Sequence, residues 1–302
     1  MNATPEPLRL QKTLLGLAAS GDAPALASLL AWGVDPGFDD SAPLSYAALN
    51  GHAQCVKILL PLSDPAALGS RALRWAAKNG RLECAKLLLP ACFASAEFDG
   101  RSALDLAAMN GHVECVRLLI PLGHVQARNS AALRFAADNG HAECVKLLLP
   151  LSDPKANGSQ ALFWAARHGH AECARILIPL SDPATFSPAL MRSVASGHFE
   201  CSKLLLDALD ASSRHEKALH EALKYGREDI VEFMLARDPK ALAGLDLDQQ
   251  IIGAVHNCHF ELAAFLRAIA EKAVFAAASA SEQALLHDAS RGPRHAMTKR
   301  RL

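Results

Sequence analysis

One phrase recurs along most of this 302-residue chain, and its clearest copy is Asn139-Gly140-His141-Ala142-Glu143-Cys144-Val145-Lys146-Leu147-Leu148-Leu149-Pro150-Leu151-Ser152-Asp153-Pro154. Aligned on its glycine, the copies form one column with Gly21, Gly51, Gly80, Gly111, Gly140, Gly169, Gly197 and Gly226, and with Cys258 in a degenerate ninth copy. The steps along this column are 30, 29, 31, 29, 29, 28, 29 and 32 residues. Such a period is typical of stacked units that cannot bury their apolar faces alone. The sequence therefore predicts a solenoid of about nine units.

Each unit contains the pattern of two helices. Before the glycine, apolar and small residues recur at i, i+3 and i+4, as in Leu73, Ala76 and Ala77. After the glycine the same spacing gives the apolar stripe of a second helix, in Cys144, Leu147 and Leu148. The glycine ends the first helix and the proline closes the second. We therefore expect an all-α array of helix-turn-helix repeats joined by short loops.

Two polar positions frame the first helix. A serine often precedes it, and we expect its hydroxyl to cap the exposed N–H groups of the helix in Ser41, Ser70, Ser130, Ser159 and Ser187. An asparagine often stands before the glycine, where we expect a helix-end residue that tolerates left-handed dihedral angles.

The best copy carries a family resemblance. It reads Asp99-Gly100-Arg101-Ser102-Ala103-Leu104-Asp105-Leu106-Ala107-Ala108-Met109-Asn110-Gly111-His112. This order resembles the D-x-x-G-x-T-P-L-H-x-A-A-x-x-G-H word of the ankyrin repeat family, and the likeness covers about five sixths of the chain. It implies an ankyrin-like α-solenoid whose partners usually dock on the concave face that the first helices line.

The units are shorter than those of the family. Ankyrin repeats have about 33 residues, whereas most units here have about four fewer, and the missing residues fall in the Pro-Leu-Ser-Asp-Pro connection. We therefore expect the projecting β-hairpin finger to be reduced to a turn in several units, which disfavours binding through fingertips.

The repeat runs without a break from about residue 13 to about residue 266, which indicates one elongated domain. Residues 1–12 show little periodicity and are expected to be a flexible lead-in. Residues 260–280 are rich in alanine and predict a longer helix that caps the open stack, so that residues 13–280 form the repeat domain. Residues 281–302 contain Lys299-Arg300-Arg301 and are expected to form a basic, mobile tail.

The composition disfavours several classes of partner. Apolar residues make up 51% of the chain and aromatic residues 5%, with Ala and Leu in excess, which favours helices. Lys plus Arg equal Asp plus Glu at 31 each, so no net field attracts nucleic acid or an anionic membrane. No apolar run reaches the roughly 18 residues of a membrane span. We expect a protein partner, no nucleic acid, no membrane and a monomeric chain.

The eight cysteines follow the repeat. Six occupy one slot of successive units: Cys55, Cys84, Cys115, Cys144, Cys173 and Cys201. Stacked helices place equivalent atoms about 10 Å apart, whereas a disulfide needs Cα atoms within about 7 Å. We therefore expect reduced, buried thiols and an intracellular, cytoplasmic location. Cys92 and Cys258 lie outside this slot and are the two candidates for a reactive thiol.

Metal or catalytic chemistry has little support in the sequence. The His-x-x-Cys pairs, such as His141 and Cys144, are metal-ligand types one helical turn apart, but each unit offers two ligands where zinc needs about four. No phosphate-binding loop, paired-carboxylate motif or nucleophile elbow is present. We expect no metal, no cofactor and no enzyme. The alternative is a metal- or thiol-dependent activity around Cys258 and His259.

The residues that differ most between copies lie on the first helix, rotated by about 200° from its buried leucine. In each unit an aromatic or apolar residue stands at this position, and a polar or apolar residue follows it three or four positions later. We define the first-helix row as Tyr46, Trp75, Lys78, Leu106, Met109, Phe135, Asp138, Trp164, Arg167 and His168.

Two interpretations of this row stay open. Exposed aromatic residues are the kind of anchor that dominates protein interfaces, and large side chains also pack on neighbouring units where fingers are missing. We expect a partner protein to lie along the row, with Trp75, Phe135 and Trp164 as anchors and with Lys78, Asp138 and Arg167 setting specificity. Ala-rich copies with shortened connections look more like bacterial than animal ankyrin proteins, so a secreted effector that acts on a host protein is an alternative. A scaffold that joins copies of itself is another.

Overall fold

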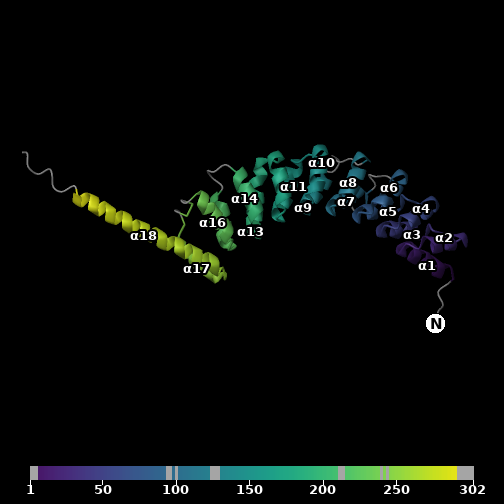
Figure 1. The fold of residues 1–302 in the computed structure, drawn as a ribbon, viewed down its shortest axis with the longest axis horizontal. Helices are drawn as coiled ribbons and strands as arrows, with labels where there is room; N and C mark the ends of the chain where they lie inside the picture. Colours follow the sequence, from purple (N-terminus) through teal and green to yellow (C-terminus); the bar gives the residue numbers. More distant parts are fainter. Residues whose placement is uncertain are drawn as a thin grey trace, which may run out of the picture. The chain divides into compact units, whose positions relative to one another are not determined.

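The computed structural model describes residues 6–92, 97–98, 101–122, 130–209, 215–238, 241–242 and 245–290. The chain divides into two compact units after Asp210 (Figure 1). The sequence predicted one unbroken array, and the division falls at Asp210-Ala211-Ser212-Ser213-Arg214, where the Pro-Leu-Ser-Asp-Pro connection is missing.

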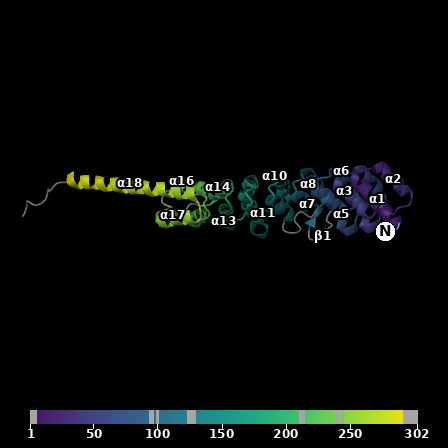
Figure 2. The same cartoon turned by 90° about the horizontal axis from the view of Figure 1, so that it is seen from below.

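The first unit is a stack of helix pairs. Its first helices are α1 (Glu6–Ser20), α3 (Phe38–Asn50), α5 (Ala67–Lys78), α7 (Ala103–Met109), α9 (Ala131–Asp138), α11 (Ala156–Arg167) and α13 (Phe186–Ser196). Its second helices are α2 (Ala23–Ala31), α4 (Ala53–Leu59), α6 (Leu82–Leu88), α8 (Val113–Leu119), α10 (Ala142–Leu148), α12 (Ala171–Leu177) and α14 (Phe199–Ala208). Successive first helices pack on one another, and within this unit they form the inner layer of a gently curved stack (Figures 1 and 2).

The second unit contains two further pairs, α15 (His215–Lys224) with α16 (Glu228–Arg237) and α17 (Leu247–His256) with α18 (Phe260–Ser290). The predicted C-terminal helix is present and runs ten residues beyond the expected end at residue 280. The basic residues Lys299-Arg300-Arg301 lie outside the described residues. None of the helices that the structure describes is long and apolar enough to cross a membrane.

The N-terminal boundary differs from the sequence-based expectation. Helix α1 begins at Glu6, so residues 6–12 are helical rather than part of a lead-in. Pro7 did not prevent this, because the first turn of a helix does not use the N–H group that proline lacks.

The core repeats once per unit. In the unit of α9 and α10, the fully buried side chains are Leu133, Ala136, Ala137, Cys144, Val145 and Leu148. The cysteine stripe is confirmed, although Val145 rather than Leu147 completes it, since Leu147 is half-buried. All eight cysteines are free thiols.

The glycine column ends the first helices with left-handed backbone. Gly140, for example, has φ of 79°. The preceding asparagines are not left-handed, contrary to the expectation: Asn139 has φ of −104°. Its side chain instead donates to the Phe135 carbonyl at 2.9 Å. Glycine takes the left-handed position because it lacks the Cβ that makes this region costly.

A left-handed turn that the sequence analysis missed precedes several first helices. Three consecutive residues have φ between 50° and 68° in each of Asp39-Asp40-Ser41, Leu68-Gly69-Ser70 and Asn157-Gly158-Ser159. Asp, Asn and Gly adopt the left-handed backbone conformation most readily. Their frequent occurrence before the serine could therefore have predicted this turn. Arg74 helps to hold its own turn, since its guanidinium donates to the carbonyls of Leu68 and Gly69.

The serines that end these turns, and Ser130 before α9, do not cap their own helices, which corrects the prediction. The hydroxyls of Ser41, Ser130 and Ser159 accept hydrogen bonds from the N–H groups of Asp64, Asp153 and Asp182, at 2.9, 2.7 and 2.8 Å. Each bond joins residues 23 positions apart, in successive units. Ser187 lies inside α13.

A finger is present before α7. Strands β1 (Glu97–Phe98) and β2 (Arg101–Ser102) pair antiparallel, with Phe98 opposite Arg101. Ser102 and Asp105 then form a reciprocal capping box at the start of α7. This is the copy that follows the ankyrin word most closely. In other units a short 3₁₀ turn follows the second helix, such as Leu60–Leu62 after α4 and Leu149–Leu151 after α10, as the shortened connections predicted.

Candidate functional site

The structure brings the first-helix row together on α3, α5, α7, α9 and α11, the helices of the inner layer of the first unit. Its members differ in exposure. Leu106 is buried, with 7% of its surface exposed. Tyr46, Trp75, Met109, Phe135, Asp138 and Trp164 are half-buried, and Lys78, Arg167 and His168 are exposed. The row therefore combines ring edges held in the stack with charged groups in solvent.

Contacts between units hold the rings. Tyr46 and Trp75, from α3 and α5, meet edge to face with their centroids 5.5 Å apart. Arg71 lies over the Trp75 ring at 5.3 Å and also donates to Ser45 of the preceding unit. Edge-to-face pairs add about 0.5–1.5 kcal/mol to the burial of the rings. The rings thus contribute to packing and keep one side toward solvent.

A guanidinium covers each of the other two aromatic rings. Arg134 lies 4.3 Å and Arg101 lies 5.5 Å from the centroid of Phe135. Arg167 lies 4.8 Å from the centroid of Trp164. Arginine favours such stacking because its guanidinium is planar and weakly hydrated.

The densest part of the row joins α9 to α11. Oδ1 of Asp138 is shielded from solvent and lies 2.7 Å from Nδ1 of His168, an ion pair whenever the imidazole is protonated. The His168 ring lies 5.7 Å from Trp164 and 6.3 Å from His170. His168 occupies the slot that is asparagine in the four preceding units, so its ring is available for these contacts.

A histidine ladder holds the backbone of the row. Four histidines that follow a glycine donate through Nε2 to the carbonyl two residues before the glycine of the preceding unit, at 2.9–3.0 Å: His52 to Ala19, His112 to Lys78, His141 to Met109 and His170 to Asp138. Arg81 makes the equivalent bond to Leu49 at 3.2 Å. Burial lowers the pKa of His170, while its bond to the Asp138 carbonyl acts in the opposite direction. The repeated phrase therefore fixes the carbonyls of Lys78, Met109 and Asp138, whose side chains vary.

The asparagines fix the same helices from within. Asn79, Asn110 and Asn139 each donate to the carbonyl four residues earlier, in Trp75, Leu106 and Phe135, at 2.8–2.9 Å. Each of these carbonyls belongs to an aromatic or apolar member of the row. In each of these helices, the asparagine bonds to the carbonyl at the start of the row's segment and the histidine of the next unit bonds to the carbonyl at its end. The side chains of the row therefore project from a backbone that is held at both positions.

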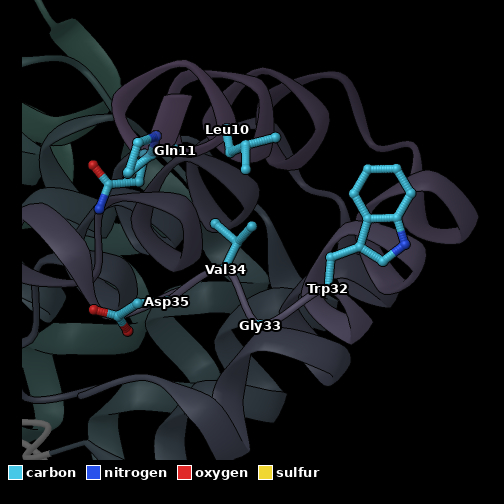
Figure 3. A pocket seen from close by; sticks show the side chains of 7 residues that line it. Leu10, Gln11, Trp32, Gly33, Val34 and Asp35 are labelled. Atoms are coloured by element: carbon cyan, nitrogen blue, oxygen red, sulfur yellow. The ribbon is translucent and has the colours of Figure 1, made fainter. Parts of the chain in front are cut away.

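A further feature that the sequence analysis missed is a cavity of about 460 Å³ at the first pair of helices. Figure 3 shows Leu10 and Gln11 of α1 on one side and Trp32, Val34 and Asp35 of the connection after α2 on the other. Trp32 is 79% exposed. In the sequence, this cavity could have been suspected from a tryptophan directly before Gly33-Val34-Asp35-Pro36, the segment that follows the apolar stripe of α2.

Burial makes most of the thiols unreactive. Burial raises the pKa of Cys84, Cys144, Cys173 and Cys201 to about 11. Cys92, a candidate for a reactive thiol, is half-buried, donates to the Pro65 carbonyl at 3.2 Å, and has its pKa raised by burial to about 11. Cys258 is exposed.

This distribution predicts selective alkylation. With a pKa of about 11, a thiol is about one part in a thousand thiolate at pH 8, so iodoacetamide should modify Cys258 first and the buried thiols far more slowly. Peptide mass spectrometry over time gives the order. The same protein in urea should react at all eight cysteines, and rapid modification of Cys144 in the folded protein would contradict the assignment.

The region around Cys258 and His259 does not stand out as a site. The His259 ring lies over Gly226, as the ladder histidines lie over their glycines. Cys258 has φ of 60°, the left-handed conformation of the glycine column. Across the described ranges, no three His, Cys, Asp or Glu side chains are grouped so that they could hold a metal ion.

Comparison with known proteins gives a consistent result. A family model described as ankyrin repeats, in three copies, matches residues 14–97, 44–131, 92–157, 122–187 and 180–249. No curated protein matches the chain. The overlapping matches extend over residues 14–249, which is more than half of the chain, and they follow the same repeats that the stacked helix pairs display. The chain belongs to the ankyrin repeat family.

Proposed function

We propose that this protein is a non-catalytic interaction module that binds a partner protein along the first-helix row. Ankyrin repeats generally act as protein–protein interaction modules. The observation that carries the proposal is that each unit contains two kinds of position, those that repeat from unit to unit and those that vary. The glycine, histidine and cysteine positions serve the stack, whereas the row varies from unit to unit on a backbone fixed by the histidine ladder.

The row has the physical properties of a binding surface. Trp75, Phe135 and Trp164 are half-buried, so a partner that covers them loses little side-chain entropy in ordering them. Lys78 and Arg167 extend into solvent, and Asp138 is paired with His168. Tryptophan and arginine are enriched among interface hot spots, and a polar rim usually surrounds the apolar centre of an interface.

Substitution of the two tryptophans tests the proposal. Affinity purification with mass spectrometry first identifies the partner, and its affinity is then measured for the full chain and for Trp75→Ala with Trp164→Ala. Truncation of two anchors should weaken binding by about 30-fold or more, since a hot-spot residue contributes at least about 2 kcal/mol. Urea unfolding of the same variant separates this loss from a loss of stability.

The third tryptophan provides a matched control. Trp32 is exposed and lies on the connection after α2, outside the row. Trp32→Ala should leave the affinity unchanged. If the double variant lowers stability but binds the partner like the original protein, the rings serve packing alone and the proposal is wrong.

We infer that the protein acts in a reducing compartment inside a cell. Eight free thiols, six of them buried in one repeated slot, support this location, because disulfides are the usual use of abundant cysteine in secreted proteins. Measurement of the thiol state in freshly lysed cells tests it, and a bridged cysteine pair would contradict it.

A further inference from the structure

The charges of the first unit are distributed unevenly between its two layers. From α5 to α13, the first helices carry six basic residues and two acidic ones: Arg71, Arg74, Lys78, Arg134, Arg167 and Arg192 against Asp105 and Asp138. In the same units, from α6 to α14, the second helices carry five basic residues and six acidic ones. From α5 to α13 the inner layer is therefore basic, although the chain has no net charge and α3 carries Asp39 and Asp40.

The two layers also differ in how the charges are used. On the second helices, lysine and arginine pair with a glutamate three residues earlier, as in Lys86 with Glu83 and Lys146 with Glu143. On the first helices from α5 to α13, both carboxylates are engaged, Asp105 with Ser102 and Asp138 with His168. Within the described ranges no carboxylate lies within ion-pair distance of Lys78, Arg101, Arg134, Arg167 or Arg192.

Three of these cations are held in place by aromatic rings. The guanidinium groups of Arg101 and Arg134 lie over the ring of Phe135, and that of Arg167 lies over the ring of Trp164. A guanidinium stacked by its face keeps its N–H edge for other partners, and that edge matches a carboxylate in a two-point hydrogen bond. The ring thus lowers the entropy that the arginine loses when it binds a carboxylate.

The spacing of the cations defines the shape of the ligand. They occur in five consecutive units, on or directly before α5, α7, α9, α11 and α13. Neighbouring helices pack about 10 Å apart, and an extended chain rises about 3.3 Å per residue. An extended segment with a carboxylate at every third position therefore offers about one carboxylate per unit. A helix rises about 1.5 Å per residue, so at the same sequence spacing its carboxylates are too close together for this.

We propose that the first-helix row, together with Arg101, Arg134 and Arg192 beside it, recognises an extended acidic segment of a partner protein, in which Asp or Glu recurs about every third residue. The inference rests on the proposed function and adds the chemistry of the partner. Lys78, Arg101, Arg134, Arg167 and Arg192 bind the carboxylates, and the rings of Phe135 and Trp164 orient the stacked arginines.

The ring geometry favours an acidic peptide over single-stranded nucleic acid. Bases bind such proteins by stacking on free aromatic faces. Here Arg71 covers Trp75, Arg134 covers Phe135 and Arg167 covers Trp164. The rings therefore do not offer the free faces on which bases stack, and the guanidinium groups of Arg134 and Arg167 beside them bind anionic groups such as carboxylates.

Fluorescence anisotropy with the full chain tests the proposal. The probe is a labelled peptide of about 15 residues with glutamate at every third position and serine or glycine between, since four steps of about 10 Å correspond to about 12 extended residues. Three comparison probes are a peptide of the same composition with its glutamates clustered at one end, the lysine version of the spaced peptide, and a thymidine oligonucleotide of similar length. The spaced acidic peptide should bind at least about tenfold more tightly than each of them.

Charge reversal locates the binding. Lys78→Glu, Arg134→Glu and Arg167→Glu together should weaken binding of the spaced peptide by at least about tenfold. The matched control reverses three charges of the second helices, Lys86→Glu, Lys146→Glu and Arg175→Glu, at the same net charge, and should bind like the original protein. Lys78→Gln with Arg134→Gln and Arg167→Gln provides a milder variant if the first does not fold.

The outcomes separate this inference from the proposed function. Preferred binding of the oligonucleotide, equal binding of the clustered or lysine peptide, no binding of the spaced peptide, or equal loss in the control variant would each overturn the inference. If the purified partner loses affinity for the double tryptophan variant but keeps it for the charge-reversal variant, the row binds a protein and the acidic chemistry is wrong. If it keeps its affinity for both, the proposed function fails as well.

Discussion

Gly140→Ala is expected to lower the free energy of unfolding by about 2–3 kcal/mol. The left-handed conformation costs an alanine about 1–2 kcal/mol, and Gly140 has φ of 79°. The new Cβ would also lie 2.5 Å from Nδ1 of His170, closer than such atoms approach. His170 cannot turn away without losing its bond to the Asp138 carbonyl, which adds about 1 kcal/mol. Urea unfolding followed by circular dichroism gives the value.

Gly158→Ala separates the two contributions. Gly158 has φ of 68°, but a Cβ built there meets nothing within 4 Å. Its substitution should therefore cost about 1 kcal/mol, from the backbone conformation alone. If Gly140→Ala costs no more than Gly158→Ala, the stacking of histidine on glycine does not restrict this position, and the histidine ladder stabilises the stack less than its geometry indicates.

Leu133→Ala is expected to cost about 3 kcal/mol. Leu133 is fully buried in α9, where first helices of both neighbouring units pack on it. Removal of a buried leucine loses its transfer free energy and leaves a cavity, which together cost about 2.7–5 kcal/mol in well-packed cores. The stack cannot close this cavity easily, because the ladder and the serine bonds fix the spacing of adjacent units. Urea unfolding measures the loss.

Leu151→Ala makes the same chemical change in the connection after α10. Leu151 is 41% exposed, so less apolar surface is lost and no closed cavity forms. We expect a cost below about 1 kcal/mol. A comparable loss for the two variants would show that the connections contribute to the core as much as the first helices do, contrary to the burial pattern.

Much of the candidate site was predictable, because helix periodicity places residues on faces. Trp75, Phe135 and Trp164 share the inner layer as the spacing indicated, and Lys78 and Arg167 are exposed beside them. The degree of burial was not predictable, because it depends on how far neighbouring units leave the rings uncovered. The sequence offered exposed and packed rings as alternatives, and the structure shows rings that are half-buried, with a guanidinium or another ring against them.

The sequence alone determined the period, the helix pairs, the helix-ending glycines and the buried cysteines, since each follows from local propensity and apolar spacing within one unit. Only the tertiary structure showed that His170 bonds to the Asp138 carbonyl, that Ser130 accepts from Asp153, and that His168 meets Asp138. These contacts join residues 32, 23 and 30 positions apart. They depend on the distance and rotation between stacked units, which a pattern within one unit does not contain.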